Sequence, residues 1–583
     1  MATQNEGGGK DEIKTQFMTR EGIYKLMTLS EYSRPTRGAF NGQGNTPVKV
    51  SFITLNDQSG TGDRICFNIG KELYFYVYKG VRKAADLTKP IDKRVYKGTF
   101  PTCHDFNQLT ATTDSVMLLV GFTAGQVQLI DPIKKELSKL YNEERLIDRS
   151  KVTCIKWIPG SPNQFLVSHV SGQMYVYNEE LPCGTTSPHY QLFKQGDGFS
   201  VHTCKTKSTR NPLYRWLVGE GSINEFAFSP CTKYVATVSQ DGFMRVFDYN
   251  SMELAGMMKS YFGGLLCVCW SPDSKYIVTG GEDDLVTVWS LNERRVVCRG
   301  QGHKSWVNVV AFDRYTTSVC DNEMLDFSGS DDDFNHMPHA NTGLLHEALR
   351  TSTRSNTSRG SSKSIDSKGV NMITSYRFGS VGQDTMLCLW DLTEDILRMP
   401  VGRHRTSTVV SQNACGVSPK SNNSVPSQNC VTNMTLDNAV PHHSSSSSGV
   451  TTSLTQKFAT FTLGDRKEKD HDRKEHKRNF SLGSKNNDKV IRTIDDSLRL
   501  LGTPSCPRLD DVLLLEPLVC KKVAHERLTA LVFHEDCMVA ACQEGYVYTW
   551  ARPGKVGLAQ QHTVTTPPQT LPCQPPALGS TAL

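Results

Sequence analysis

The sequence lacks several patterns that would assign it to a class at once. None of its 18 cysteines forms a C-x-x-C pair, no uncharged apolar run approaches the roughly 18 residues of a membrane-spanning helix, and the first ten residues contain no apolar signal segment. The Walker A, dinucleotide-binding, zincin and nucleophile-elbow motifs are also absent. We therefore expect a soluble protein inside the cell, with free thiols and with no metal, cofactor, small-molecule substrate or membrane.

An excess of charge of one sign is lacking too. The 583 residues include 65 Lys and Arg against 59 Asp and Glu, so the formal net charge is only +6. This balance gives no argument for nucleic acid or an anionic membrane as a partner. The densest charge cluster, 465–478, has 7 basic and 5 acidic residues and no aromatic ring, which favours a solvated linker over a nucleic-acid site.

A short repeat is present. Six segments begin with a small or turn residue, continue with alternating apolar side chains, and end with an aromatic or large apolar residue followed by Asp, Asn, Ser or Ala. They are GQVQLID at 125–131, GQMYVYN at 172–178, GFMRVFD at 242–248, DLVTVWS at 284–290, TMLCLWD at 385–391 and GYVYTWA at 545–551. Each predicts a short strand after a tight turn. Uninterrupted copies recur after 178 − 131 = 47 and 290 − 248 = 42 residues, close to the roughly 40 to 45 residues of a WD-repeat blade.

The dipeptides Gly302-His303 and Trp390-Asp391 complete the WD-repeat signature. With the repeat, they predict an all-β fold, a seven-bladed WD-repeat β-propeller with long disordered insertions. An all-β sandwich is the alternative, but it does not account for the two dipeptides at matching offsets.

One polar set in the sixth blade looks catalytic but is predicted to be structural. His303, Ser380, Asp384 and Trp390 stand where a WD repeat places a buried chain from indole N–H through hydroxyl and imidazole to carboxylate. A His, Asp and Ser set also fits a hydrolase. However, the indole occupies the chain and no Gly-x-Ser-x-Gly elbow presents the serine. We therefore predict no catalytic residue and no enzyme activity.

Domain boundaries follow from where the repeat pattern stops and resumes. We expect an N-terminal extension at 1–47 with a possible ring-closing strand at 22–27, blades one to five and the start of blade six at 48–317, a disordered insertion at 318–372, the rest of blade six at 373–396, a disordered Ser-rich and charged insertion at 397–515, blade seven at 516–556, and a disordered tail at 557–583. The insertions have too little apolar content to offset the entropy of ordering. Within the propeller, 182–220 is expected to be an ordered long loop packed on the rim.

The insertions contain candidate modification and targeting signals. Arg354 precedes Thr357 by three positions and Arg478 precedes Ser481 by three, which makes Thr357, the adjacent Ser358, and Ser481 possible phosphorylation sites. Basic residues at 473–478 resemble a weak import signal, and the leucine-rich spacing at 509–515 resembles an export signal or simply leads into the last blade. The prediction is a cytoplasmic and nuclear protein that can shuttle.

Two exposed aromatic residues mark a candidate partner-binding face. Phe262 and Trp306 fall in equivalent loops before blades five and six, in polar or Gly-rich surroundings where core packing does not require large rings. Aromatic rings on neighbouring blades are suited to anchoring a protein partner. Tyr261 beside them and the acidic Glu282 and Asp283 in the next loop are predicted to add contacts and charge complementarity. The alternative for Trp306 is a packing role within its own blade.

Four long strings go beyond the repeat: KGVRKAADL at 79–87, SYFGGLLCVCWSPD at 260–273, GGEDDLVTVW at 280–289 and FGSVGQDT at 378–385. They resemble the family of WD repeat-containing protein 20 and the dystrophia myotonica WD-repeat protein, and the similarity covers roughly 15–317, 373–396 and 500–556. The resemblance implies a non-catalytic regulatory subunit that binds and activates ubiquitin-specific proteases 12 and 46, together with WD repeat-containing protein 48. The family's protease-binding aromatics match Phe262 and Trp306.

A substrate receptor or scaffold of a cullin-type ubiquitin ligase is the competing function. Many such propellers carry Trp-Asp followed two residues later by Arg. Here Trp390-Asp391 is followed by Leu392-Thr393, so the motif is absent at this place.

Overall fold

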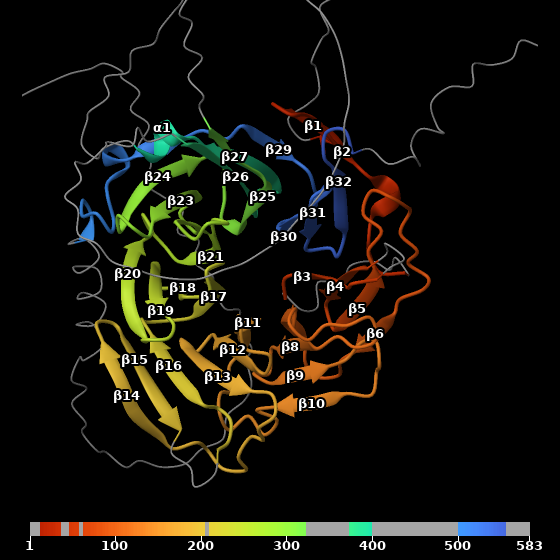
Figure 1. The fold of residues 1–583 in the computed structure, drawn as a ribbon, viewed down its shortest axis with the longest axis vertical. Helices are drawn as coiled ribbons and strands as arrows, with labels where there is room; N and C mark the ends of the chain where they lie inside the picture. The colour runs from red at the N-terminus through yellow and green to blue at the C-terminus, as the bar shows by residue number, and fades with distance from the viewer. Residues whose placement is uncertain are drawn as a thin grey trace, which may run out of the picture. The chain divides into compact units, whose positions relative to one another are not determined.

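The sheets of this protein form a ring. The computed structural model describes residues 12–35, 46–57, 62–204, 209–321, 372–398 and 500–555. Seven sheets in this part of the chain make a seven-bladed β-propeller (Figure 1), which confirms the predicted fold. Most of the two predicted insertions and all of the predicted tail lie outside the described residues.

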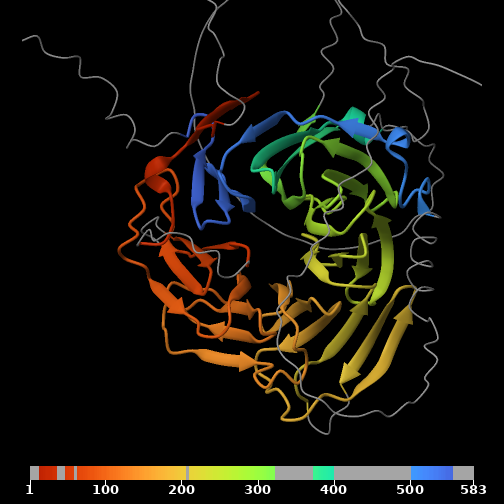
Figure 2. The same ribbon diagram turned by 180° about the vertical axis from the view of Figure 1, so that it is seen from behind.

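Three blades have four strands in simple sequence order. Blade one contains β3 (Val50–Thr54), β4 (Asp63–Ile69), β5 (Glu72–Val77) and β6 (Asp92–Val95); blade two contains β7 (Pro101–Phe106), β8 (Leu118–Phe122), β9 (Val127–Ile130) and β10 (Ser138–Tyr141); blade four contains β17 (Ile223–Phe228), β18 (Tyr234–Ser239), β19 (Phe243–Asp248) and β20 (Glu253–Lys259). The first strand of each blade lies next to the centre of the ring and the fourth at the rim (Figure 2).

Blade three is wider than predicted. Its strands, from the centre outward, are β11 (Val152–Trp157), β12 (Gln164–His169), β13 (Gln173–Asn178), β16 (Tyr214–Val218), β15 (Phe199–Cys204) and β14 (Tyr190–Gly196). The expectation of a long loop at 182–220 is therefore wrong. Residues 214–218 alternate partly and fully buried side chains, with Trp216 and Val218 inside, and this alternation makes them the fourth strand of the blade.

Blade five also gains a strand. It comprises β21 (Leu265–Trp270), β22 (Tyr276–Gly281), β23 (Leu285–Ser290), β24 (Arg295–Gln301) and β28 (Leu513–Leu515), with β28 parallel to β24. The predicted disordered insertion 397–515 is thus wrong at its C-terminal end. Residues 500–515, which include the short helix η2 (Leu509–Asp511), cover the outer edge of blade five because their apolar side chains, Cys506 and Leu515 among them, are buried there.

Blade six is assembled from separated segments. Its strands are β25 (Val307–Asp321), β26 (Met372–Gly382), β27 (Met386–Leu392) and β29 (Val519–Lys522), and the short helix α1 (Glu394–Leu397) follows β27. The predicted start of blade seven at 516 is wrong, because β29 pairs with β27 and completes blade six. The first insertion is also shorter than predicted, since Asp321 pairs with Met372.

Blade seven closes the ring with strands from both ends of the described chain. It contains β30 (Leu528–Phe533), β31 (Cys537–Cys542), β32 (Val547–Ala551), β2 (Gly22–Leu26) and β1 (Gln16–Thr19), and the short helix η1 (Thr28–Ser30) follows β2. Figure 1 shows the red strands beside blue β32. Leu26 pairs with Trp550 and Lys25 with Ala551, so the segment considered for closure occupies the ring-closing position.

The first position of the repeat has a left-handed backbone in all six copies. The φ values are 87° at Gly125, 80° at Gly172, 81° at Gly242, 61° at Asp284, 64° at Thr385 and 96° at Gly545. Each residue ends the turn between the second and third strands of its blade. Because this conformation favours glycine, four of the six copies begin with it.

The apolar cores of the propeller lie between blades. Seven clusters of buried apolar residues occur in the described chain, one at each contact between neighbouring blades. Trp289 and Trp390, the aromatic residues that end their repeats, are fully buried in two of them. Each sheet thus covers its neighbours on both faces, so strands such as β13, β19 and β23 are buried along almost their whole length.

A buried ion pair joins blades six and seven. Arg552, just after β32, donates from Nη1 and Nη2 to the two carboxylate oxygens of Asp313 in β25, each at 2.7 Å. The guanidinium also bonds Tyr24 Oη of β2 and the carbonyl of His534. Asp313 is fully buried, so the pair ties the closing strands to the neighbouring blade.

Deleting residues 1–30 should lower the melting temperature markedly, because it removes β1 and β2 and leaves β32 as an unpaired edge. Burial of Phe17, Tyr24 and Met27 would be lost, about 5 kcal/mol or more at the usual value for buried side chains. Differential scanning calorimetry measures the effect. Deleting only 1–11, which removes no described strand, is the control, and an unchanged midpoint for the longer deletion would rule out this closure.

Replacing 322–371 or 399–499 by short Gly/Ser linkers should leave the melting temperature nearly unchanged, because all described strands remain and loop length is a weak entropic penalty. Extending the second replacement through 515 should destabilise the propeller, because β28 is lost from the edge of blade five. Melting of the three variants in parallel checks this. Unfolding of the 399–499 variant would show that the segment supplies structure to the propeller.

Arg552→Leu should lower the free energy of unfolding by about 3–5 kcal/mol, because the Asp313 carboxylate stays buried without its guanidinium. The double variant Asp313→Leu, Arg552→Leu should recover much of this loss. Denaturant unfolding of the three proteins provides the comparison. If the single variant costs less than about 1 kcal/mol, the pair does not hold the closure.

Candidate partner-binding face

Phe262 and Trp306 lie on equivalent loops of adjacent blades. Phe262 lies between β20 and β21, and Trp306 between β24 and β25. Both loops run from the fourth strand of one blade to the first, inner strand of the next, so they open on the same face of the propeller. Their side chains are 57% and 42% exposed, so both rings are open to solvent on this face. The packing role considered for Trp306 does not agree with this exposure.

Hydrogen bonds hold the Phe262 loop in place. The fully buried Ser260 donates its N–H to the carbonyl of Gly242 at 2.8 Å and its hydroxyl to the carbonyl of Gly263 at 2.6 Å. Gly263 has φ +66° and lies close to Glu282, where an added Cβ would be 2.9 Å from the glutamate Cβ. The backbone of the loop is therefore fixed while the Phe262 ring is exposed.

Glu282 and Asp283 fix this loop from the neighbouring turn of blade five. Glu282 is partly exposed, and its two oxygens accept hydrogen bonds from the Gln240 side chain and the Gly264 N–H. Asp283 is only 5% exposed and accepts the N–H of Tyr261 at 3.0 Å. Burial raises the pKa of Asp283 to about 6, against the opposing effect of that hydrogen bond.

The prediction that Asp283 contributes surface charge for a partner is therefore wrong. Its carboxylate is used inside the protein, as is that of Asp384 in blade six. The sequence contains the signal, since 289 − 283 = 6 and 390 − 384 = 6 place both aspartates at one distance from the aromatic residue of their repeat. Tyr261 is half-buried, and the buried guanidinium of Arg299 lies 5.2 Å from its ring centre.

The predicted tetrad fixes the Trp306 loop. Ser380 Oγ accepts the indole N–H of Trp390 at 2.8 Å and lies 2.7 Å from His303 Nε2, while His303 Nδ1 is 3.1 Å from both oxygens of Asp384. The structure thus brings all four residues together. Ser380 is fully buried with its hydroxyl bonded on two sides, so this arrangement is one that orders a loop and does not present a nucleophile.

Asp384 has a second link to the same loop. It accepts the backbone N–H of Lys304 at 2.9 Å, and the adjacent Gln383 N–H donates to the carbonyl of Trp306 at 2.9 Å. Burial acts to raise the pKa of Asp384, but hydrogen bonds from His303 and from the Lys304 N–H outweigh it, so the pKa lies below its ordinary value. Both aromatic loops are therefore held by an aspartate, buried Asp283 or partly buried Asp384, from the turn between the second and third strands of the blade that the loop enters.

The sequence analysis does not predict that the segment containing Ser505 and Cys506 supports the Phe262 loop. The carbonyl of Ser505 accepts the Lys259 N–H at 2.9 Å, and the thiol of Cys506 contacts the carbonyl of Ser260 at 3.6 Å. The leucine-rich spacing at 509–515 is the available signal for this segment. Its Leu515 is buried and its Leu513 packs against the core between blades five and six, so these side chains serve packing.

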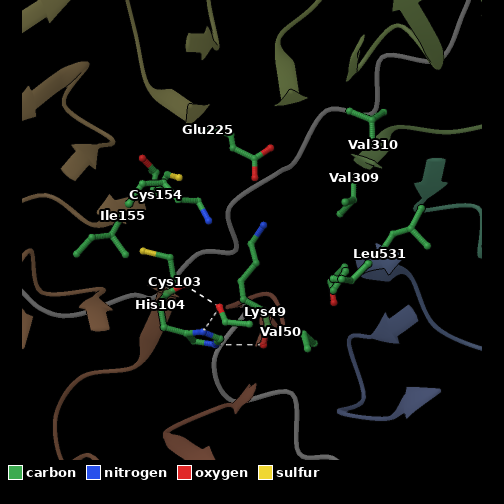
Figure 3. Close-up of a pocket in the computed structure, with 16 residues that line it drawn as sticks. Lys49, Val50, Cys103, His104, Cys154, Ile155, Glu225, Val309, Val310 and Leu531 are labelled. Atoms are coloured by element: carbon green, nitrogen blue, oxygen red, sulfur yellow. Dashed lines mark hydrogen bonds between the residues drawn. The ribbon is translucent and has the colours of Figure 1, made fainter. Parts of the chain in front are cut away.

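A cavity of about 220 Å³ lies among the inner strands (Figure 3). Lys49 extends toward Glu225 across it, Lys156 pairs with Asp105 at 3.1 Å, and His104 bonds Ser51 Oγ at 2.7 Å. Burial raises the pKa of the lining thiols Cys103 and Cys154, to about 11 and about 12, so both stay protonated and are weak nucleophiles.

The remaining predicted sites are not tested. Thr357, Ser358 and Ser481 lie outside the described residues. Within the described ranges, no group of His, Cys, Asp and Glu is placed to hold a metal ion. No helix in the same ranges has the length and apolar character to span a bilayer.

Comparison with known proteins agrees with the propeller. The family model of the WD domain, G-beta repeat, matches residues 211–248 and 256–290, which contain strands of blades three to five. WD-repeat propellers are generally non-catalytic scaffolds for binding.

Two relatives match nearly the whole chain. WD repeat-containing protein 20 of Mus musculus is 59% identical over 579 residues, covering 96% of this chain and 100% of the relative. The WD repeat-containing protein 20 homolog of Caenorhabditis elegans is 40% identical over 646 residues, covering 94% of this chain and 84% of the relative. On this likeness, the chain belongs to the family of WD repeat-containing protein 20.

Proposed function

We propose that this propeller is a non-catalytic regulatory subunit that binds and activates a ubiquitin-specific protease, with ubiquitin-specific proteases 12 and 46 as the partners and WD repeat-containing protein 48 in the same assembly. The observation that supports the proposal is the pair of exposed rings, Phe262 and Trp306, on fixed loops of neighbouring blades. The four-string resemblance of the sequence supplies the identity of the partner.

The way these loops are held favours tight binding. Both are tied by side-chain carboxylates and by backbone hydrogen bonds to the next blade. A partner that covers the rings therefore orders few new groups, and little of the binding free energy is lost to entropy. Two aromatic anchors on a fixed surface are the usual composition of an interface hot spot.

Activation by such a subunit requires it to bind the active conformation of the protease more tightly than the idle one. Moving a 1:10 equilibrium to 10:1 takes roughly a 100-fold difference in affinity, about 2.7 kcal/mol. One or two aromatic anchors contribute on this scale. Contacts through Phe262 and Trp306 can therefore supply the binding free energy that the proposed regulation requires.

Phe262→Ala and Trp306→Ala should each weaken protease binding by about 2 kcal/mol or more, because truncating a central anchor removes its buried contacts with the partner. Neither change should lower the melting temperature appreciably, since both rings are exposed in the free protein. Isothermal titration calorimetry with the purified protease, melting curves and deubiquitination rates at saturating subunit measure the three quantities on the same samples.

Phe193→Ala is the matched control. Phe193 is 58% exposed, nearly the same as Phe262, but lies on β14 at the outer edge of blade three. The Phe193→Ala variant should bind and activate the protease as the unchanged protein does. Variants of Phe262 and Trp306 that melt, bind and activate like the unchanged protein would remove this face from the mechanism.

A further inference from the structure

Two cysteines of blade six face each other across neighbouring strands. Cys388 on β27 pairs directly with Cys520 on β29, and their sulfur atoms are 3.3 Å apart, with the Cys388 thiol donating to Cys520. Both residues lie within strands, so the register of β27 and β29, and not a loop, sets their contact. Neither residue is used in the proposed binding face.

The register suits a covalent bond between them. The N–H of Val523 donates to the carbonyl of Thr385, so these two residues form a hydrogen-bonded pair. Along antiparallel strands, hydrogen-bonded pairs alternate with non-hydrogen-bonded pairs. Cys388 and Cys520 then fall at a non-hydrogen-bonded pair, where Cα atoms are about 4.5 Å apart and side chains are closest. That separation lies within the roughly 4.4–6.8 Å found for disulfides.

The two thiols differ in exposure and surroundings. Cys388 is fully buried, whereas Cys520 is partly exposed and lies near His303 and Lys304. The hydrogen bond from Cys388 lowers the pKa of Cys520, and the two basic neighbours act in the same direction, against burial and the Asp384 carboxylate, which act to raise it. Cys520 is thus the accessible, more acidic thiol, and Cys388 is positioned to resolve its oxidised form.

We propose that Cys388 and Cys520 form a redox-sensitive modification site that peroxides convert into a disulfide between β27 and β29. The Cys520 thiolate attacks hydrogen peroxide, giving a sulfenic acid and hydroxide, which takes up the proton that Cys520 released. The Cys388 sulfur then attacks the sulfenic sulfur, the S–S bond forms, and the hydroxyl group leaves with the Cys388 proton as water. Two thiols and one peroxide become one disulfide and two waters, and the two electrons lost by sulfur reduce the peroxide.

The disulfide would fasten the outer strand of blade six. It closes a chain segment of 520 − 388 = 132 residues that includes the second insertion, and cross-links across long segments restrict the unfolded chain most. The oxidised protein should therefore melt about 5 °C higher than the reduced protein. This site does not depend on protease binding.

The test uses the full-length chain, reduced and then treated with a small excess of hydrogen peroxide. Peptide mapping by mass spectrometry should find Cys388 linked to Cys520, melting should shift upward, and dithiothreitol should reverse both. Cys388→Ser, which keeps a hydrogen-bond donor toward Cys520, should abolish the link and leave Cys520 as a sulfenic acid that dimedone labels, while Cys520→Ser should abolish both products.

Cys231→Ser is the control, because Cys231 is an exposed thiol on a turn of blade four. Its loss should leave the Cys388 to Cys520 link unchanged. Treated chain in which Cys231 is oxidised while Cys388 and Cys520 both remain thiols overturns the proposal. So does a Cys388→Ser protein whose Cys520 resists dimedone.

Discussion

The structure depends on one constraint: neither face of any blade can be left uncovered. The apolar clusters lie between sheets, and the aromatic residues that end the repeats are buried there, so each blade is stable only with a neighbour on both sides. The ring must then close on itself. The two ends of the described chain meet in blade seven, where β2 pairs with β32. The ion pair of Arg552 and Asp313 then ties this blade to blade six.

The same construction explains why the loops on one face are so well fixed. A carboxylate at one register position, Asp283 in blade five and Asp384 in blade six, reaches from the turn between the second and third strands to the loop that enters its blade. These side chains are buried and accept backbone N–H groups, which would otherwise be unsatisfied. On these rigid entry loops, the Phe262 and Trp306 side chains are exposed and can contact a partner.

The sequence predicts the fold because its signals are local, and it predicts the tetrad because the four residues stand at WD-repeat positions. Alternation and the small first residue mark strands and turns, and the offset of six residues marks the aspartates. It fails where strands come from a distance. β28 and β29 follow the long insertion and have three and four residues, too few for periodicity to register. Asp283 was misplaced on the surface because a carboxylate in a turn looks the same in sequence whether it faces solvent or a backbone N–H.

Blade six shows why the complete signature occurs where it does. Its strands come from three segments separated by insertions, and closing such loops costs only about 0.6 kcal/mol for each doubling of length. Length therefore threatens register more than stability, because a slip of one residue turns every side chain to the other face. The His303 to Trp390 network, and the bonds of Arg377 to Asp391 and to Glu21 of the closing hairpin, are satisfied in one register only. Specific polar contacts thus hold the separated segments of blade six in register, and the loop that presents Trp306 is fixed by them.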